Sequence, residues 1–108
     1  MSTFDDREKA FEKKYAHDTE MQFKAEARRN KLLGLWAAGK MGLSGDAAEA
    51  YAKSVVIADL EEAGDEDVYR KVAGDLDERG TGVTEAEIRA EMQNLLATAK
   101  DQILSEAD

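Results

Sequence analysis

Apolar side chains recur every three or four residues over most of the chain, which is the spacing of one face of an α-helix. The clearest stripe lies near the C-terminus and consists of Ile88, Met92, Leu95, Leu96, Ala99 and Ile103. Thr84 precedes this stripe as an N-cap, and Glu87 follows three residues later to complete a capping box. The pattern therefore predicts a helix over about 85–104.

Two shorter stripes lie upstream, and each is followed by a glycine that can end a helix. They predict helices over about 47–63 and 66–79. Asp65 is the expected N-cap of the second helix, since a short carboxylate can accept from the free amides of the first turn. Residues 55–58 of the first helix are apolar on nearly every side. We therefore expect this helix to be the most deeply buried one.

The N-terminal third contains neither glycine nor proline before Gly34 and could form one long helix. Its apolar stripe begins with Phe4, Phe11 and Tyr15 and resumes with Leu32, Leu33 and Trp36. Between these two groups the same face is largely polar. Thr19 can cap a new helix in this polar stretch, with Gln22 at the third position. The pattern predicts a break near residue 18 and a second helix over about 20–38.

Together these elements predict an all-α protein. The expected fold is a four-helix bundle over residues 19–108, with residues 1–18 as a mobile, potentially helical N-terminal arm. An isolated helix of this length is marginal in water, so we expect the arm to fray and project. Periodicity alone leaves an alternative open, in which the arm folds back and its aromatic side chains extend the core.

Composition and charge argue against a nucleic-acid-binding, membrane-spanning or secreted protein. The 108 residues include no proline and no cysteine, and the formal net charge is −9. Residues 1–31 hold eight basic against seven acidic side chains, and residues 32–108 hold seven against seventeen. This acidic balance argues against nucleic-acid binding, and the basic run 28–31 is interpreted as a solvated helix face. No apolar run is long enough for a membrane span or a signal peptide, so we expect a cytoplasmic protein without direct membrane insertion.

Two short motifs imitate ligand sites. Residues 34–40 read GLWAAGK, the spacing of a phosphate-binding loop, but no strand precedes them and Met41 replaces the hydroxyl that binds magnesium. Residues 75–87 resemble a calcium loop, but Arg79 occupies a ligand position. No histidine, cysteine or serine is arranged for catalysis. We therefore expect no cofactor, no metal site and no catalytic residue, and keep a nucleotide- or calcium-responsive helical regulatory or adaptor protein as the alternative.

Two long runs carry a family resemblance. FDDREKAFEKKYAHDTEMQFKAEARRNKLLGLWAAGKMG and AEAYAKSVVIADLEEAGDEDVYRKVAGDL resemble the zeta subunit of the alphaproteobacterial F-type ATP synthase, a small ATPase inhibitor. The resemblance implies a regulatory subunit rather than an enzyme. It also implies that the N-terminal segment enters a subunit interface of the catalytic head as a helix and blocks ATP hydrolysis and reverse rotation. The implied partners are the alpha, beta and gamma subunits, with the free protein a monomer and the bound protein peripheral to the inner membrane.

The arm carries the expected partner-binding residues. Its aromatic side chains fall on one side of a helix and charged side chains cover the rest, a pattern typical of helix-in-groove recognition. With the resemblance, the expected contacts are Phe4, Asp5, Arg7, Lys9, Phe11, Lys13, Lys14 and Tyr15. His17 is a candidate pH-sensitive hinge, because imidazole changes charge near neutral pH.

Overall fold

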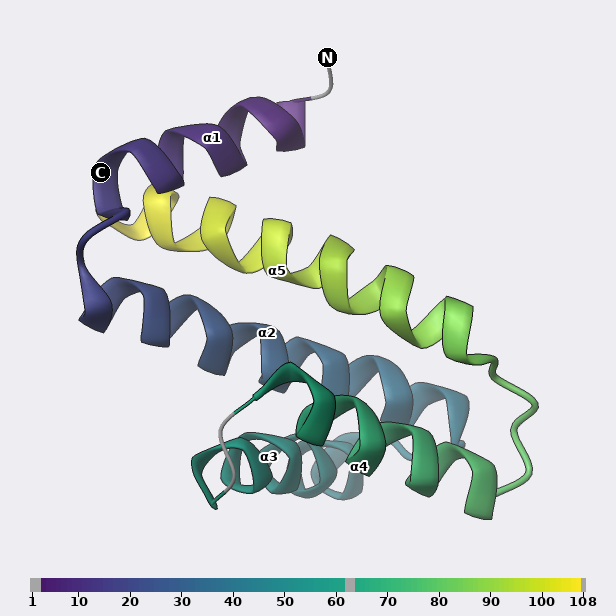
Figure 1. The fold of residues 1–108 in the computed structure, drawn as a ribbon. Helices are drawn as coiled ribbons and strands as arrows, with labels where there is room; N and C mark the ends of the chain where they lie inside the picture. The colour runs from purple at the N-terminus through teal and green to yellow at the C-terminus, as the bar shows by residue number, and fades with distance from the viewer. Residues whose placement is uncertain (1–2, 62–63, 108) are drawn as a thin grey trace.

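The computed structural model describes residues 3–61 and 64–107, and throughout these ranges the regular structure is helical. Figure 1 shows the five helices: α1 (Thr3–Tyr15), α2 (Thr19–Lys40), α3 (Gly45–Glu61), α4 (Asp65–Glu78) and α5 (Glu85–Ala107). The predicted all-α class is confirmed. None of the described helices is both long and apolar enough to cross a membrane.

The number of packed helices differs from the predicted four-helix bundle with a projecting arm. The arm segment forms α1, which packs against α5 and touches the start of α2. Figure 1 shows α1 beside the C-terminal half of α5, and α1 and α3 on opposite sides of the pair formed by α2 and α5. The physical reason is that α1 has an apolar side that the C-terminal half of α5 can cover.

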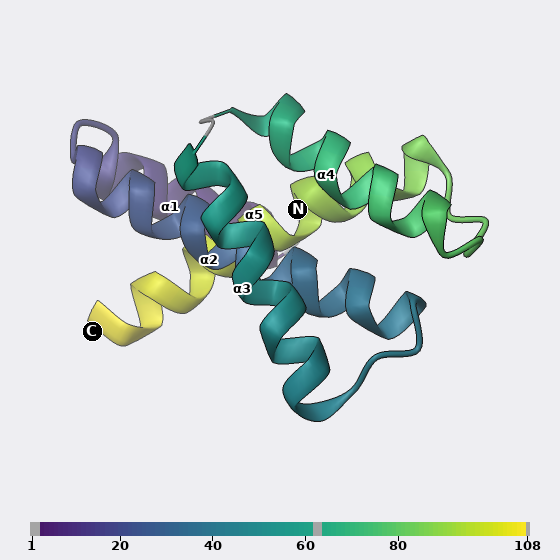
Figure 2. The same cartoon turned by 90° about the horizontal axis from the view of Figure 1, so that it is seen from below.

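The central helix of the molecule is α2, which packs against all four others. We predicted the deepest burial for the helix over 47–63, and that prediction is wrong. Val55 of α3 is buried, but Ile57 and Leu60 are 43% and 60% exposed. Figure 2 shows α3 lying across α2; it packs against α2 and α4, and the rest of its surface faces solvent. Its outer face therefore exposes apolar side chains, including Ile57 and Leu60, together with charged ones such as Lys53.

The structure confirms one of the predicted helix N-caps and corrects two others. The Thr84 hydroxyl accepts the amide of Glu87 at 3.2 Å, which confirms the N-cap of α5. At α2, however, Asp18 rather than Thr19 is the N-cap, because its carboxylate accepts the amide of Met21 at 3.1 Å. At α4 the N-cap is Gly64 instead of Asp65, and no side chain caps this end.

The core consists of two clusters at opposite ends of α2. The larger cluster joins α2, α3, α4 and α5 and contains Leu33, Ala37, Val55, Val68, Val72, Leu76, Ile88 and Met92. The smaller cluster joins α1, α2 and α5 and contains Phe11, Ala25, Ile103 and Leu104. Because α1 contributes only to the smaller cluster, the larger one is complete without it.

A buried polar network corrects the interpretation of residues 28–31 as a solvated face at two positions, Arg29 and Asn30, whereas Lys31 is exposed. The guanidinium of Arg29 donates to Asn30 Oδ1 at 2.8 Å and to Asp65 Oδ1 at 2.8 Å. Asn30 in turn donates to Asp59 Oδ2 at 3.0 Å. Both Arg29 and Asn30 are buried, and these bonds satisfy the polar groups that burial removes from water. The network fixes α2 to the end of α3 and the start of α4.

Candidate functional site in the N-terminal helix

The predicted partner-binding residues all lie in α1, and the structure describes the side chains of five of them. The side chains of Phe4, Asp5 and Arg7 lie outside the described part of the chain. The described ones are Lys9, Phe11, Lys13, Lys14 and Tyr15. These five divide into an inward-facing aromatic group and an outward-facing basic group.

Phe11 is the anchor of α1 on the rest of the molecule. Its side chain is 0% exposed and packs with Ala25 of α2 and with Ile103 and Leu104 of α5. The Tyr15 ring lies 5.0 Å from the Phe11 ring, centroid to centroid, and is half-buried. Full burial of a phenylalanine contributes roughly 1.5–3 kcal/mol, which is a large share of what can hold one short helix in place.

Lys100 of α5 supplies the charged part of this contact. Its residue is only 8% exposed, and its ammonium lies 2.6 Å from Glu12 Oε1 and 3.5 Å from Glu8 Oε1. The same ammonium lies 5.8 Å from the centre of the Phe11 ring, within the range of a cation–π contact. One buried cation therefore faces two carboxylates and the aromatic anchor of α1.

Sequence reasoning missed Lys100, although the chain holds a signal for it. Leu96, Lys100 and Leu104 are spaced by four residues, so the lysine occupies a position in an apolar row of α5. A lysine in such a row has to find an anionic partner or reach solvent.

The three described lysines of α1 point outward. Lys9, Lys13 and Lys14 are exposed, and the Lys14 ammonium lies 5.3 Å from the centre of the Tyr15 ring. The aromatic and the basic members of the predicted contact set are thus separated: Phe11 faces inward and the lysines face solvent. While α1 is packed on α5, the lysines are accessible to a partner and the Phe11 ring is not.

A short turn connects α1 to α2. The carbonyl of Tyr15 accepts the amide of Asp18 at 3.0 Å and the side-chain amide of Gln22 at 3.0 Å. His17 is exposed and lies in this turn, so its position is compatible with the predicted hinge between α1 and α2. Gln22 therefore holds the end of α1 to the first turn of α2.

The apparent phosphate loop is a helix-packing feature. Gly34 lies inside α2, and a Cβ atom there would come 2.6 Å from Ala52 Cα on α3. The Lys40 ammonium lies 5.8 Å from the centre of the Trp36 ring on the same helix. The glycine that begins the motif therefore allows α2 and α3 to pack closely.

The first acidic residue of the apparent calcium loop, Asp75, takes part in contacts within the protein. Asp75 accepts the Tyr51 hydroxyl at 2.8 Å and the Lys71 ammonium at 3.0 Å. Burial and this hydrogen bond raise the pKa of Tyr51 above its ordinary value. Within residues 3–61 and 64–107, no cluster of three or more acidic, histidine or cysteine side chains is arranged to hold a metal ion.

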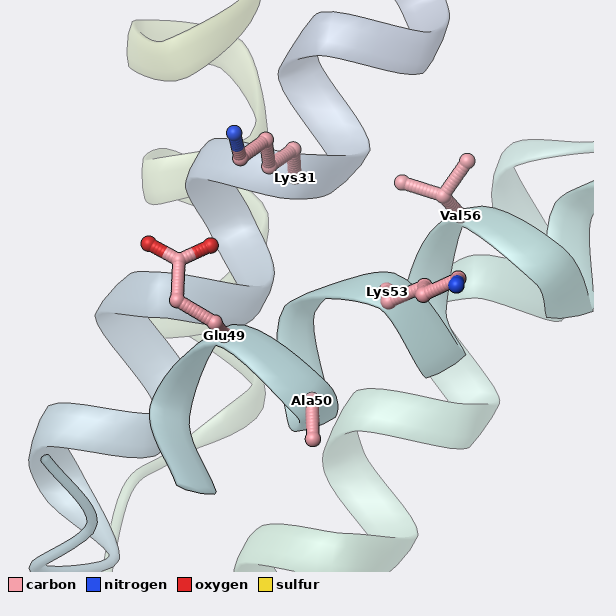
Figure 3. Close-up of a pocket in the computed structure, with 5 residues that line it drawn as sticks. All are labelled: Lys31, Glu49, Ala50, Lys53 and Val56. Atoms are coloured by element: carbon pink, nitrogen blue, oxygen red, sulfur yellow. The ribbon is translucent and has the colours of Figure 1, made fainter. Parts of the chain in front are cut away.

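A surface pocket of about 410 Å³ lies between α2 and α3. Figure 3 shows its lining, with Lys31 from α2 and Glu49, Ala50, Lys53 and Val56 from α3. Its charged groups come from solvent-facing helix positions, and it lies away from α1. The pocket adds nothing to the arrangement around Phe11 and Lys100.

The fold and the amphipathic helix packed at its edge place the chain among small all-helical proteins. It belongs to the ATPase inhibitor subunit zeta family, whose model matches residues 1–102. The chain is also similar to a solved chain described as "Solution NMR structure of the protein", with 62% identity, 80% of this chain and 98% of that chain covered, and a TM-score of 0.70. No curated protein matches it. Membership of this family supports a role as an inhibitor subunit associated with ATP synthase.

Proposed function

We propose that this protein inhibits ATP hydrolysis by the F-type ATP synthase by inserting α1 into a subunit interface of the catalytic head. The observation that carries the proposal is the family match, which extends over residues 1–102 and so includes all of α1. The chemistry of α1 supports it, since this helix combines a fully buried aromatic anchor with a row of exposed lysines. That combination suits a helix that enters an apolar groove with an acidic rim.

Insertion requires α1 to leave α5. Phe11 is sealed between α2 and α5 while α1 is packed on its own protein, so its ring cannot touch a partner in that state. After release the ring and Tyr15 become anchors, and Lys9, Lys13 and Lys14 become rim contacts to the alpha, beta or gamma subunits. Buried aromatic contacts contribute most of the binding energy in such interfaces, and rim charges contribute less.

The remaining helices serve as the body that carries α1. The larger core cluster is complete without α1, so α2–α5 remain folded when α1 moves. An interface that opens admits the helix, and closure of the interface then traps it. Such a wedge stops rotation in the hydrolysis direction and so acts on one direction of the motor.

Deletion of residues 1–18 tests the function. The shortened protein should keep the far-ultraviolet circular dichroism and the dispersed amide spectrum of folded α2–α5, and its inhibition of a cognate ATPase should fall by more than about tenfold. Residual inhibition equal to that of the full chain would show that another surface is responsible. A full chain that inhibits nothing would refute the function itself.

A further inference from the structure

The contacts between α1 and α5 form a compact set, which we call the α1 latch: Glu8, Phe11, Glu12, Lys100, Ile103 and Leu104. Its apolar part is the Phe11 ring against Ile103 and Leu104, and its polar part is the Lys100 ammonium against Glu8 and Glu12. Both parts join α1 to one half of α5. They therefore form or break together when α1 moves.

The latch uses the same side chain that the proposed inhibitory contact needs. Phe11 can occupy its buried position between α2 and α5 or a groove on a partner, but not both at once. Self-docking and insertion are therefore alternative states of one helix. A protein whose competent state is only partly populated binds with an affinity that is reduced by that fraction.

Lys100 is the residue that sets this balance from outside α1. It lies on α5, so a change there leaves every side chain of the inserted helix unaltered. Its two carboxylate partners in the described part of the chain are both on α1, so its ammonium contributes to the docked state. A negative charge at this position would face Glu8 and Glu12 across the same contact and repel them.

We infer that the α1 latch is an autoinhibitory contact, and that Lys100 determines how readily the protein becomes an inhibitor. This inference rests on the proposed function, since it concerns the regulation of the same helix. In the resting protein α1 is docked, and release of the latch limits the rate at which the motor is inhibited.

The first test compares Lys100→Glu with Lys53→Glu, a matched control with the same charge change on the exposed surface of α3. Lys100→Glu should increase amide hydrogen exchange of residues 8–15 and the rate of ATPase inhibition, each by about three- to tenfold. Lys53→Glu should change neither. Faster exchange in α1 with an unchanged rate of inhibition would overturn the inference, as would unchanged exchange in Lys100→Glu.

The second test locks the latch and does not depend on tolerance of a new charge. The chain contains no cysteine, so Glu8→Cys and Lys100→Cys provide a unique pair for a short, reducible bifunctional thiol reagent. The crosslinked protein should not inhibit, and cleavage of the crosslink should restore inhibition at a rate at least equal to that of the wild-type chain. Full inhibition by the crosslinked protein would overturn the latch.

The two proposals fail in distinguishable ways. If the function fails, neither the wild-type chain nor the cleaved double variant inhibits the ATPase, whatever hydrogen exchange shows for α1. If only the latch fails, the wild-type chain inhibits, the deletion of residues 1–18 does not, and Lys100→Glu behaves as Lys53→Glu does.

Discussion

Gly34 shows how a single missing methyl group positions two helices. A Cβ atom at this residue would lie 2.6 Å from the backbone Cα of Ala52, a distance that only a shift of α2 or α3 can relieve. At Gly74 on the exposed side of α4, by contrast, no neighbouring atom lies within 4 Å of the position that a Cβ atom would take. The same substitution should therefore have opposite effects at the two sites.

We expect Gly34→Ala to lower the free energy of unfolding by about 1–3 kcal/mol, because overpacking outweighs the gain in helix propensity. Gly74→Ala should raise it by roughly 0.5–1 kcal/mol, since alanine restricts the unfolded chain and favours a helix. Urea unfolding followed by circular dichroism measures both. A stabilising Gly34→Ala would mean that α2 and α3 are not in close contact.

Substitutions at Phe11 and Lys14 compare the buried anchor of the proposed interface with its charged rim. Phe11→Ala should weaken inhibition of the ATPase by more than about tenfold, whereas Lys14→Ala should weaken it by less than about threefold. The measurement is the concentration for half inhibition at two ionic strengths. Equal effects of the two substitutions, both reduced by salt, would assign the interface to electrostatics instead.

At the residue scale, the sequence predicts which side chains share a helix face but not which distant residues they contact. The stripe of α1 indicates that Phe11 and Tyr15 share a face, and it leaves open whether the rest of the protein covers that face. The answer depends on Ile103 and Leu104, which are about ninety positions away along the chain. For the same reason the burial of Arg29, which pairs with Asp65 across two helices, is invisible to local periodicity.

At the scale of helices, two exposed ion pairs connect different helices. Arg28 of α2 pairs with Glu106 of α5, and Arg89 of α5 pairs with Glu66 of α4. The hydrogen bonds from these arginines lower the pKa of both Glu66 and Glu106. A carboxylate with a lowered pKa in the folded state stabilises that state above its unfolded pKa, and loses this contribution as the pH falls through the folded value.

The unfolding free energy should therefore change little between about pH 7 and pH 5 through these groups and should fall below about pH 4. The double variant Glu66→Gln and Glu106→Gln should show a shallower acid decline than the wild-type chain. Thermal unfolding across this pH range tests it. Identical acid profiles would mean that neither pair contributes, which is the usual result for pairs fully screened by solvent.

The existence of a helix is easier to predict than its environment. The capping box at Thr84 and the glycines after α3 and α4 are local signals, and local signals are what a sequence displays directly. The predicted burial of α3 is wrong because it assumed that apolar residues such as Ile57 and Leu60 lie inside the protein. Apolar atoms also cover much of a protein's surface.

At the scale of the molecule, two separate core clusters imply two levels of stability. The cluster that includes α1 is the smaller, and the other four helices share the larger one. Amides of residues 8–15 should therefore exchange with solvent at least about tenfold faster than those near Leu33 and Val72. Native-state hydrogen exchange read by NMR gives this comparison. A common exchange rate would show that α1 unfolds only with the whole protein.

The turn between Tyr15 and Asp18 limits how far the released helix can travel. With 13 residues at 1.5 Å each, α1 is about 20 Å long, and this length sets its reach from the beginning of α2 in the proposed released state. Under the proposed mechanism, helices α2–α5 must therefore already lie close to the catalytic head before α1 can reach a subunit interface. The proposal thus separates two steps, attachment of the body of the protein and insertion of α1.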